Sequence, residues 1–122
     1  MLPLPGHTPG SVCLLNSEEK ILFTGDSIVA TPVWMYLKHS TSLSTYLASL
    51  KKLRVRQDEF ETLLPGHQPT PLGKSQLDDL IGCAEEILNG TGIGVPAQTF
   101  AGEGLQWKHG SGIILYDPSR LH

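Results

Sequence analysis

The chain has 122 residues, of which 39% are hydrophobic and 17% are charged, proportions that favour one compact domain over a disordered chain. Its formal net charge of −3 provides no electrostatic basis for binding nucleic acid or an anionic membrane surface. No apolar stretch approaches the roughly 20 residues that span a bilayer, and the first residues show no signal-peptide pattern, so we expect a cytoplasmic protein without membrane contact.

A pair of antiparallel strands is predicted first, at residues 11–16 and 20–24. Both segments are rich in apolar side chains, and a short polar turn between them folds the second strand back onto the first. Such a hairpin places His7 just before its first strand and Asp26 just after its second strand. The two side chains are therefore expected at the same end of the sheet.

Residues 27–39 are predicted to form a loop that contains Trp34 and Tyr36. Because the loop directly follows Asp26, these two aromatic side chains are candidates for the wall of a substrate pocket. Packing against the sheet is the alternative, and the sequence leaves both open. His39 shows no spacing to another potential ligand and is interpreted as a polar surface residue.

Two helices are predicted, at residues 41–53 and 74–89. In each of them apolar side chains recur along one face, which indicates packing on a core rather than contact with a cofactor. Asn89-Gly90 ends the second helix, because glycine readily adopts the left-handed conformation that closes a helix. Between the helices, residues 61–64 are predicted to form a third strand that leads to His67.

The last part of the chain is rich in glycine, and short strands are predicted near residues 95–100 and 112–116. Cys13 falls in a predicted strand and Cys83 in a predicted helix. Both are therefore interpreted as small buried hydrophobic residues rather than as disulfide partners.

Three short apolar runs end in glycine and are followed by a side chain that can bind a metal ion. These pairs are Gly6-His7, Gly25-Asp26 and Gly66-His67. A strand that stops at glycine presents the next side chains at the rim of the sheet, where a loop can aim them at a shared centre. Each pair alone is common in loops and turns. Because imidazole and carboxylate groups are the usual ligands of zinc, iron and manganese, the joint pattern predicts a metal site.

These pairs belong to longer motifs: His-Thr-Pro-Gly-Ser at residues 7–11, Phe-Thr-Gly-Asp at residues 23–26 and Leu-Pro-Gly-His at residues 64–67. In their order and context the motifs resemble the third, fourth and fifth metal motifs of the metallo-β-lactamase-fold hydrolases. Within that family, the glyoxalase II-like (hydroxyacylglutathione hydrolase-like) branch is the most similar.

The resemblance implies a role for each predicted ligand. His7 would bind a first metal ion, Asp26 would be the bridging carboxylate of the catalytic centre, and His67 would bind a second ion. The metal would be zinc, or iron or manganese. The implied reaction is the attack of metal-activated water on a thioester or another ester-type bond of a small-molecule substrate.

One family motif has no counterpart here: a His-x-His-x-Asp-His loop, which supplies about half of the ligands, occurs nowhere in the sequence. We therefore expect residues 1–122 to be the C-terminal part of a metallo-β-lactamase-like domain, weakly active or inactive alone. The implied fold is α/β (α+β), half of an αββα sandwich with a mixed β-sheet and helices on one face. The other face is expected to be apolar and exposed and to pair two copies into a homodimer.

Two other functions remain open. A folded chain that binds no metal would act as a structural or dimerisation module, and alanine at His7, Asp26 and His67 would then change nothing. Alternatively, the chain would belong to a phosphodiesterase, nuclease or lactonase of the same superfamily. The acidic charge balance argues against a nuclease.

Overall fold

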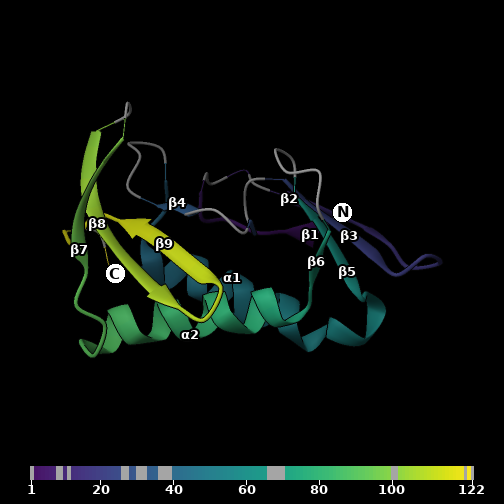
Figure 1. Ribbon diagram of the computed structural model, residues 1–122. Coiled ribbons are helices and arrows are strands. Elements are labelled where there is room, and N and C mark those ends of the chain that lie inside the picture. Colours follow the sequence, from purple (N-terminus) through teal and green to yellow (C-terminus); the bar gives the residue numbers. More distant parts are fainter. Residues whose placement is uncertain are drawn as a thin grey trace.

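The computed structural model of the chain describes residues 2–7, 10, 12–25, 28–29, 33–35, 40–65, 71–99, 102–119 and 121. Two α-helices and two β-sheets make up this part of the molecule (Figure 1). The fold class expected from the sequence, a mixed α/β arrangement, is confirmed.

The first sheet consists of β1 (Leu2–Pro3), β2 (Val12–Asn16), β3 (Ile21–Gly25), β5 (Thr62–Pro65) and β6 (Leu72–Gly73). Its strand order is β1-β2-β3-β5-β6. β2 and β3 form the predicted antiparallel hairpin, whereas β3 and β5 run parallel to each other. The sheet is therefore mixed, and it carries the strands that border the predicted metal motifs.

The second sheet consists of β4 (Val33–Met35), β7 (Val95–Thr99), β8 (Gly102–His109) and β9 (Gly112–Tyr116). Its strand order is β4-β9-β8-β7, with β4 and β9 parallel and the other neighbours antiparallel. The strands predicted near residues 95–100 and 112–116 are thus confirmed as β7 and β9.

Several details differ from the sequence-based expectation, among them the two-residue strands β1 and β6, which were not predicted. The strands fall into two sheets rather than one, because β7, β8 and β9 pair with one another and with β4. The predicted loop at residues 27–39 contains β4, a short strand that exists through its pairing with the distant β9. β8 was not predicted, since its Gly-Glu-Gly start has low strand propensity, and pairing on both sides stabilises it.

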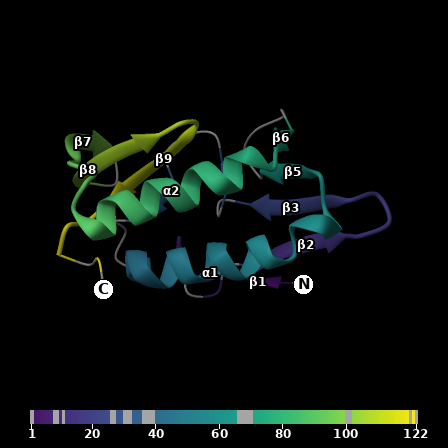
Figure 2. The same ribbon diagram turned by 90° about the horizontal axis from the view of Figure 1, so that it is seen from below.

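Both helices, α1 (Leu43–Val55) and α2 (Ser75–Asn89), lie on the same side of the two sheets (Figure 2). Ser42 caps α1 by accepting a hydrogen bond from the backbone of Thr45. As predicted, Gly90 closes α2, and its φ of 84° is in the left-handed region. No helix in the described part of the chain has both the length and the apolar character needed to cross a bilayer.

The core lies between the helices and the sheets. Side chains that are almost completely buried come from both layers and include Leu22, Tyr46, Phe60, Leu63 and Leu80. Cys13 and Cys83 are free thiols with no exposed surface, which confirms their interpretation as buried hydrophobic residues. Burial raises the pKa of the Cys13 thiol to about 11 and that of Cys83 to about 12, so both remain protonated at neutral pH.

The face of the first sheet that points away from the helices is apolar. Leu14, Phe23 and Leu64 are side by side on adjacent strands in the β2–β3–β5 register. Leu14 is 53% exposed and Phe23 is 44% exposed, and Val12 on β2 has a similar exposure. We call these four residues the outer apolar stripe. Its exposure is what the sequence led us to expect for this face.

Gly112 tests how closely β9 packs against α2. A Cβ atom at Gly112 would lie 2.8 Å from backbone atoms of Asp79 and Leu80, and helix backbone cannot yield as a flexible side chain can. We predict that Gly112→Ala lowers the free energy of unfolding by about 1–3 kcal/mol in urea denaturation. Gly73→Ala is the control, because its nearest contact would be an ordinary 3.9 Å. Equal stability of the two variants would contradict this packing.

Candidate metal centre

Three strand ends meet at one edge of the first sheet. β3 and β5 run parallel with Gly25 opposite Pro65, so both strands leave the sheet at the same edge. β2 is antiparallel to β3 and therefore begins at that edge, and His7 lies in the connection that enters β2. Asp26 directly follows Gly25 in the sequence, and His67 follows Pro65 by two positions.

Of the three predicted ligands, His7 lies within the described part of the chain, whereas Asp26 and His67 lie outside it. The roles of Asp26 and His67 thus stay predictions, as does that of Tyr36, which also lies outside the described residues. Within the described ranges, no group of three or more His, Cys, Asp or Glu side chains is arranged to hold a metal ion.

The backbone on either side of His7 is fixed by the segment that precedes α1. The amide of Thr41 donates to the carbonyl of Gly6 at 2.8 Å, and the hydroxyl of Ser40 donates to the carbonyl of His7 at 2.8 Å. Ser40 is only 3% exposed, so its bond to His7 is shielded from competing water. The backbone position of His7 is therefore fixed by hydrogen bonds to two consecutive carbonyls, those of Gly6 and His7.

Two of the motif glycines are required for different reasons. A Cβ atom at Gly6 would overlap the ring of Tyr46, a residue of α1 that is completely buried in the core. Gly6 thus lets the chain just before His7 pack closely against Tyr46 of α1. Gly25 has a φ of 55°, a left-handed conformation that favours glycine and lets the chain turn at the end of β3.

The ring of His7 is oriented by the backbone of β4. Its Nδ1 lies 2.8 Å from the carbonyl oxygen of Trp34, and a carbonyl can only accept a hydrogen bond. Nδ1 therefore carries the proton, and in the neutral ring the lone pair is on Nε2. Protein-bound imidazoles typically have this arrangement, with one nitrogen bound to the metal and the other donating to a carbonyl or carboxylate. His7 thus fits a role as metal ligand.

Trp34 lies beside His7 through this carbonyl contact. It is the central residue of β4 and is half-buried, while its neighbours Val33 and Met35 are buried. The alternation places the indole on the face opposite to those two side chains. Both the pocket-wall role and the packing role remain compatible with this position, and the pocket-wall role stays a prediction.

Sequence reasoning missed the residues that anchor the segment after Asp26. The hydroxyl of Thr24 donates to the carbonyl of Ile28 at 2.8 Å, and Nε2 of Gln76 donates to the carbonyl of Val29 at 2.9 Å. Thr24 is completely buried and Gln76 is 4% exposed. Gln76 could have been noticed as a polar residue on the apolar side of its helix, but its partner could not.

A second polar cluster joins α2 to β8. The carboxylate of Glu86 accepts hydrogen bonds from Trp107 Nε1 at 3.1 Å and from His109 Nδ1 at 2.8 Å. Both hydrogen bonds lower the pKa of the Glu86 carboxyl, and the bond from Trp107 has the larger effect. His109, which is isolated in the sequence, is therefore engaged in holding β8 on α2.

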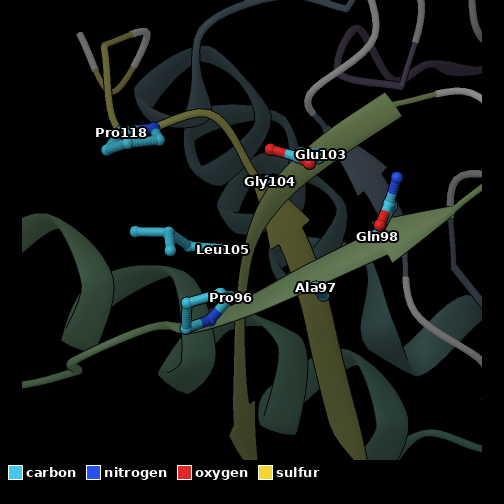
Figure 3. Close-up of a pocket in the computed structure, with 7 residues that line it drawn as sticks. All are labelled: Pro96, Ala97, Gln98, Glu103, Gly104, Leu105 and Pro118. Atoms are coloured by element: carbon cyan, nitrogen blue, oxygen red, sulfur yellow. The ribbon is translucent and has the colours of Figure 1, made fainter.

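A shallow hollow of about 510 Å³ lies on the β7–β8 hairpin (Figure 3). It is lined by Pro96, Ala97, Gln98, Glu103, Gly104, Leu105 and Pro118. Glu103 is the only titratable side chain among these seven residues, and none of the seven is a predicted site residue. The described lining of the hollow therefore shares no residue with the candidate metal centre.

Comparison with known proteins identifies the family. The family model described as the metallo-beta-lactamase superfamily matches residues 1–67, a range that holds all three predicted ligands. The chain belongs to the metallo-β-lactamase superfamily. This confirms the resemblance seen in the motifs, whereas the assignment to the glyoxalase II-like branch stays a prediction.

Among curated superfamily members, the chain is similar to proteins named acyl-coenzyme A thioesterase MBLAC2. It is 33% identical to that of Homo sapiens over 103 residues, which cover 83% of this chain and 35% of the relative. It is 38% identical to that of Gallus gallus over 69 residues, which cover 55% of this chain and 24% of the relative. The chain thus spans about a third or less of the length of these relatives.

Solved structures of superfamily members share the fold. The metallo-β-lactamase FIM-1 from Pseudomonas aeruginosa in its mono-zinc form has a TM-score of 0.57 at 22% identity, over 69% of this chain and 37% of that chain. The metallo-β-lactamase from Pontibacter korlensis has a TM-score of 0.58 at 21% identity, over 70% and 40% respectively. At these identities the likeness establishes the fold.

The tautomer of His7 can be measured directly. Because the Trp34 carbonyl accepts from Nδ1, we predict that the neutral ring carries its proton on Nδ1. In a ¹⁵N-detected NMR correlation spectrum of the metal-free chain, Nδ1 should have a pyrrole-like shift and Nε2 a pyridine-like shift. The opposite pattern would mean that the contact with β4 does not form.

Proposed function

We propose that this chain carries part of the metal centre of a hydrolase that cleaves a thioester or another ester-type bond in a small molecule. The observation that carries the proposal is the contact between Nδ1 of the His7 ring and the β4 carbonyl, which puts the lone pair of the neutral ring on Nε2, the nitrogen that would bind the metal. Membership of the superfamily and the similarity to proteins named acyl-coenzyme A thioesterase support the type of reaction. Because the chain spans a fraction of those relatives, the activity of a whole relative is a proposal here.

His7, Asp26 and His67 are the residues that would hold the ion. Two imidazoles and one carboxylate suit zinc, iron or manganese, and a four-coordinate zinc ion would retain a position for water. When bound, such an ion lowers the pKa of a water molecule toward roughly 7 and polarises a carbonyl group. Because three side chains cannot complete two four-coordinate sites, we propose a centre with a single ion rather than the two ions that the family resemblance implies.

We propose separate roles in metal binding and substrate positioning for the residues of this chain. His7 binds as the neutral imidazole, and its Nδ1–H keeps the ring from turning because the Trp34 carbonyl holds it at 2.8 Å. Asp26 is proposed as the catalytic carboxylate that completes the ligand set. Trp34 and Tyr36 are proposed as the apolar wall that positions the substrate and excludes water.

Metal content tests this proposal. We predict about one zinc, iron or manganese ion per chain by elemental analysis after dialysis, and a loss of most of this metal in His7→Ala, Asp26→Ala and His67→Ala. His109→Ala is the control, because Glu86 engages His109 in a separate cluster and its metal content should be unchanged.

Two results would count against the proposal. Metal that is retained in all three site variants would place the ion elsewhere, and metal-free wild-type protein would favour the non-catalytic alternative. If metal is bound, the relative hydrolysis of thioester, lactone and phosphodiester substrates separates the proposed reaction from the other superfamily activities.

The outer apolar stripe supports a second candidate function, dimerisation. We propose that two copies associate through this face, as two sheets stack in a β-sandwich. Leu14, Phe23 and Leu64 form a continuous row across three strands. No charged residue interrupts the outward positions of β2, β3 and β5, so a second copy can bury the row without desolvating a charge.

Light scattering tests the association. We predict a dimer at micromolar concentration for the wild-type chain and a monomer for Leu14→Lys, because a lysine within the stripe would be buried in the interface. Val55→Lys is the matched control, since Val55 is an apolar residue on α1 that is 85% exposed. A wild-type monomer, or equal dissociation by both variants, would contradict the proposed interface.

A further inference from the structure

We propose that Ser40 is the positioning residue for His7, an inference that rests on the proposed role of His7 as a metal ligand. The hydroxyl of Ser40 bonds to the carbonyl of His7 at 2.8 Å and approaches the carbonyl of Trp34 at 3.4 Å. The Trp34 carbonyl is the group that accepts the hydrogen bond from Nδ1–H of the His7 ring. Ser40 therefore contacts both the backbone of His7 and the group that orients its ring.

Polar contacts link the three residues in a ring. The ring of His7 reaches forward to Trp34, and Ser40 ties the Trp34 carbonyl back to the backbone of His7. The single hydroxyl proton serves mainly the shorter bond, to His7, and the longer contact limits the direction of the Trp34 carbonyl. Because the backbone of His7 and the Nδ1–H of its ring are both hydrogen-bonded, the ring has little freedom to turn.

Burial of Ser40 makes its hydrogen bond to the His7 carbonyl hard to replace with water. Ser40 is 3% exposed, so water cannot easily replace its hydroxyl without opening the site. Removing the hydroxyl would leave the His7 carbonyl without its buried donor, a costly change in a low-dielectric setting. The backbone of His7 would then relax, and the ring would lose its fixed orientation toward the metal.

The chain provides a closely matched comparison. Ser49 on α1 is 6% exposed, and its hydroxyl donates at 2.9 Å to the carbonyl of Pro5. Ser49 thus resembles Ser40 in residue type, burial and bond length, but it holds a carbonyl two residues before His7, and its second bond goes to the Thr45 carbonyl on α1 at 3.1 Å. Comparison of the two serines separates positioning of the ring from general stabilisation of the segment.

The first readout is zinc affinity, measured by competition with a coloured chelator on Ser40→Ala and Ser49→Ala chains. We expect Ser40→Ala to weaken zinc binding by about 10–100-fold, the usual cost of losing a partner of a metal-bound histidine. Ser49→Ala should bind zinc within about twofold of wild type, although it melts at a similarly reduced temperature. If both variants lose affinity equally, Ser40 has only a structural role and the proposal is overturned.

The second readout requires no metal. In the metal-free wild-type chain the ¹⁵N spectrum should show one His7 tautomer, whereas Ser40→Ala should give averaged shifts and Ser49→Ala the wild-type shifts. Unchanged shifts in Ser40→Ala would overturn the proposal. If wild type binds no zinc but the tautomer still depends on Ser40, the proposed function fails while the positioning role stands.

Ser40→Cys serves if Ser40→Ala does not fold. The thiol is slightly larger than the hydroxyl and is a weak donor, so the fold should be retained while the His7 carbonyl loses its strong hydrogen bond. Because a thiol can itself bind zinc, this variant is read by the metal-free tautomer spectrum, which should show averaged His7 shifts. A cysteine variant with a single wild-type tautomer would overturn the proposal.

Discussion

The parallel pairing of β3 and β5 determines where the candidate metal centre lies. Because Gly25 is opposite Pro65, the two strands leave the sheet together, and the residues that follow them in the sequence are Asp26 and Gly66-His67. Parallel neighbours require a crossover connection, and α1 lies in that connection. The helix therefore begins near the edge where β3 ends, which is why Ser40 and Thr41 meet the carbonyls of His7 and Gly6.

Local sequence patterns were sufficient for β2, β3 and β5 of the first sheet and for the helices. Alternating and periodic apolar residues identified the β2–β3 hairpin, α1 and α2, and Gly90 marked the end of α2 correctly. Glycine before a polar residue also indicated the rims of the sheet. At Gly25 the physical reason is a left-handed backbone, whereas Gly6 is required by its close contact with Tyr46.

Long-range contacts explain what the sequence could not reveal. β4 is three residues long and depends on β9, and β8 depends on both of its neighbours. The same holds for the site, since Ser40 and Gln76 act through carbonyls that are distant in the sequence. A backbone carbonyl carries no residue-specific signal, so its partner is visible only in the fold.

The two proposed functions draw on different surfaces of the same sheet. The metal centre uses the edge where β3 and β5 end, while dimerisation would use the outer apolar stripe on its face. A dimer formed through the stripe therefore leaves the ligand set unchanged. Loss of metal and loss of association can be separated by substitutions in the two regions.

Zinc K-edge X-ray absorption of the zinc-loaded chain tests the central claim most directly. A site made by His7, Asp26 and His67 predicts nitrogen and oxygen ligands at about 2.0–2.2 Å, with outer-shell scattering from two imidazole rings. A sulfur ligand at about 2.3 Å, or scattering from fewer than two imidazoles, would contradict the convergence of these three residues on one ion.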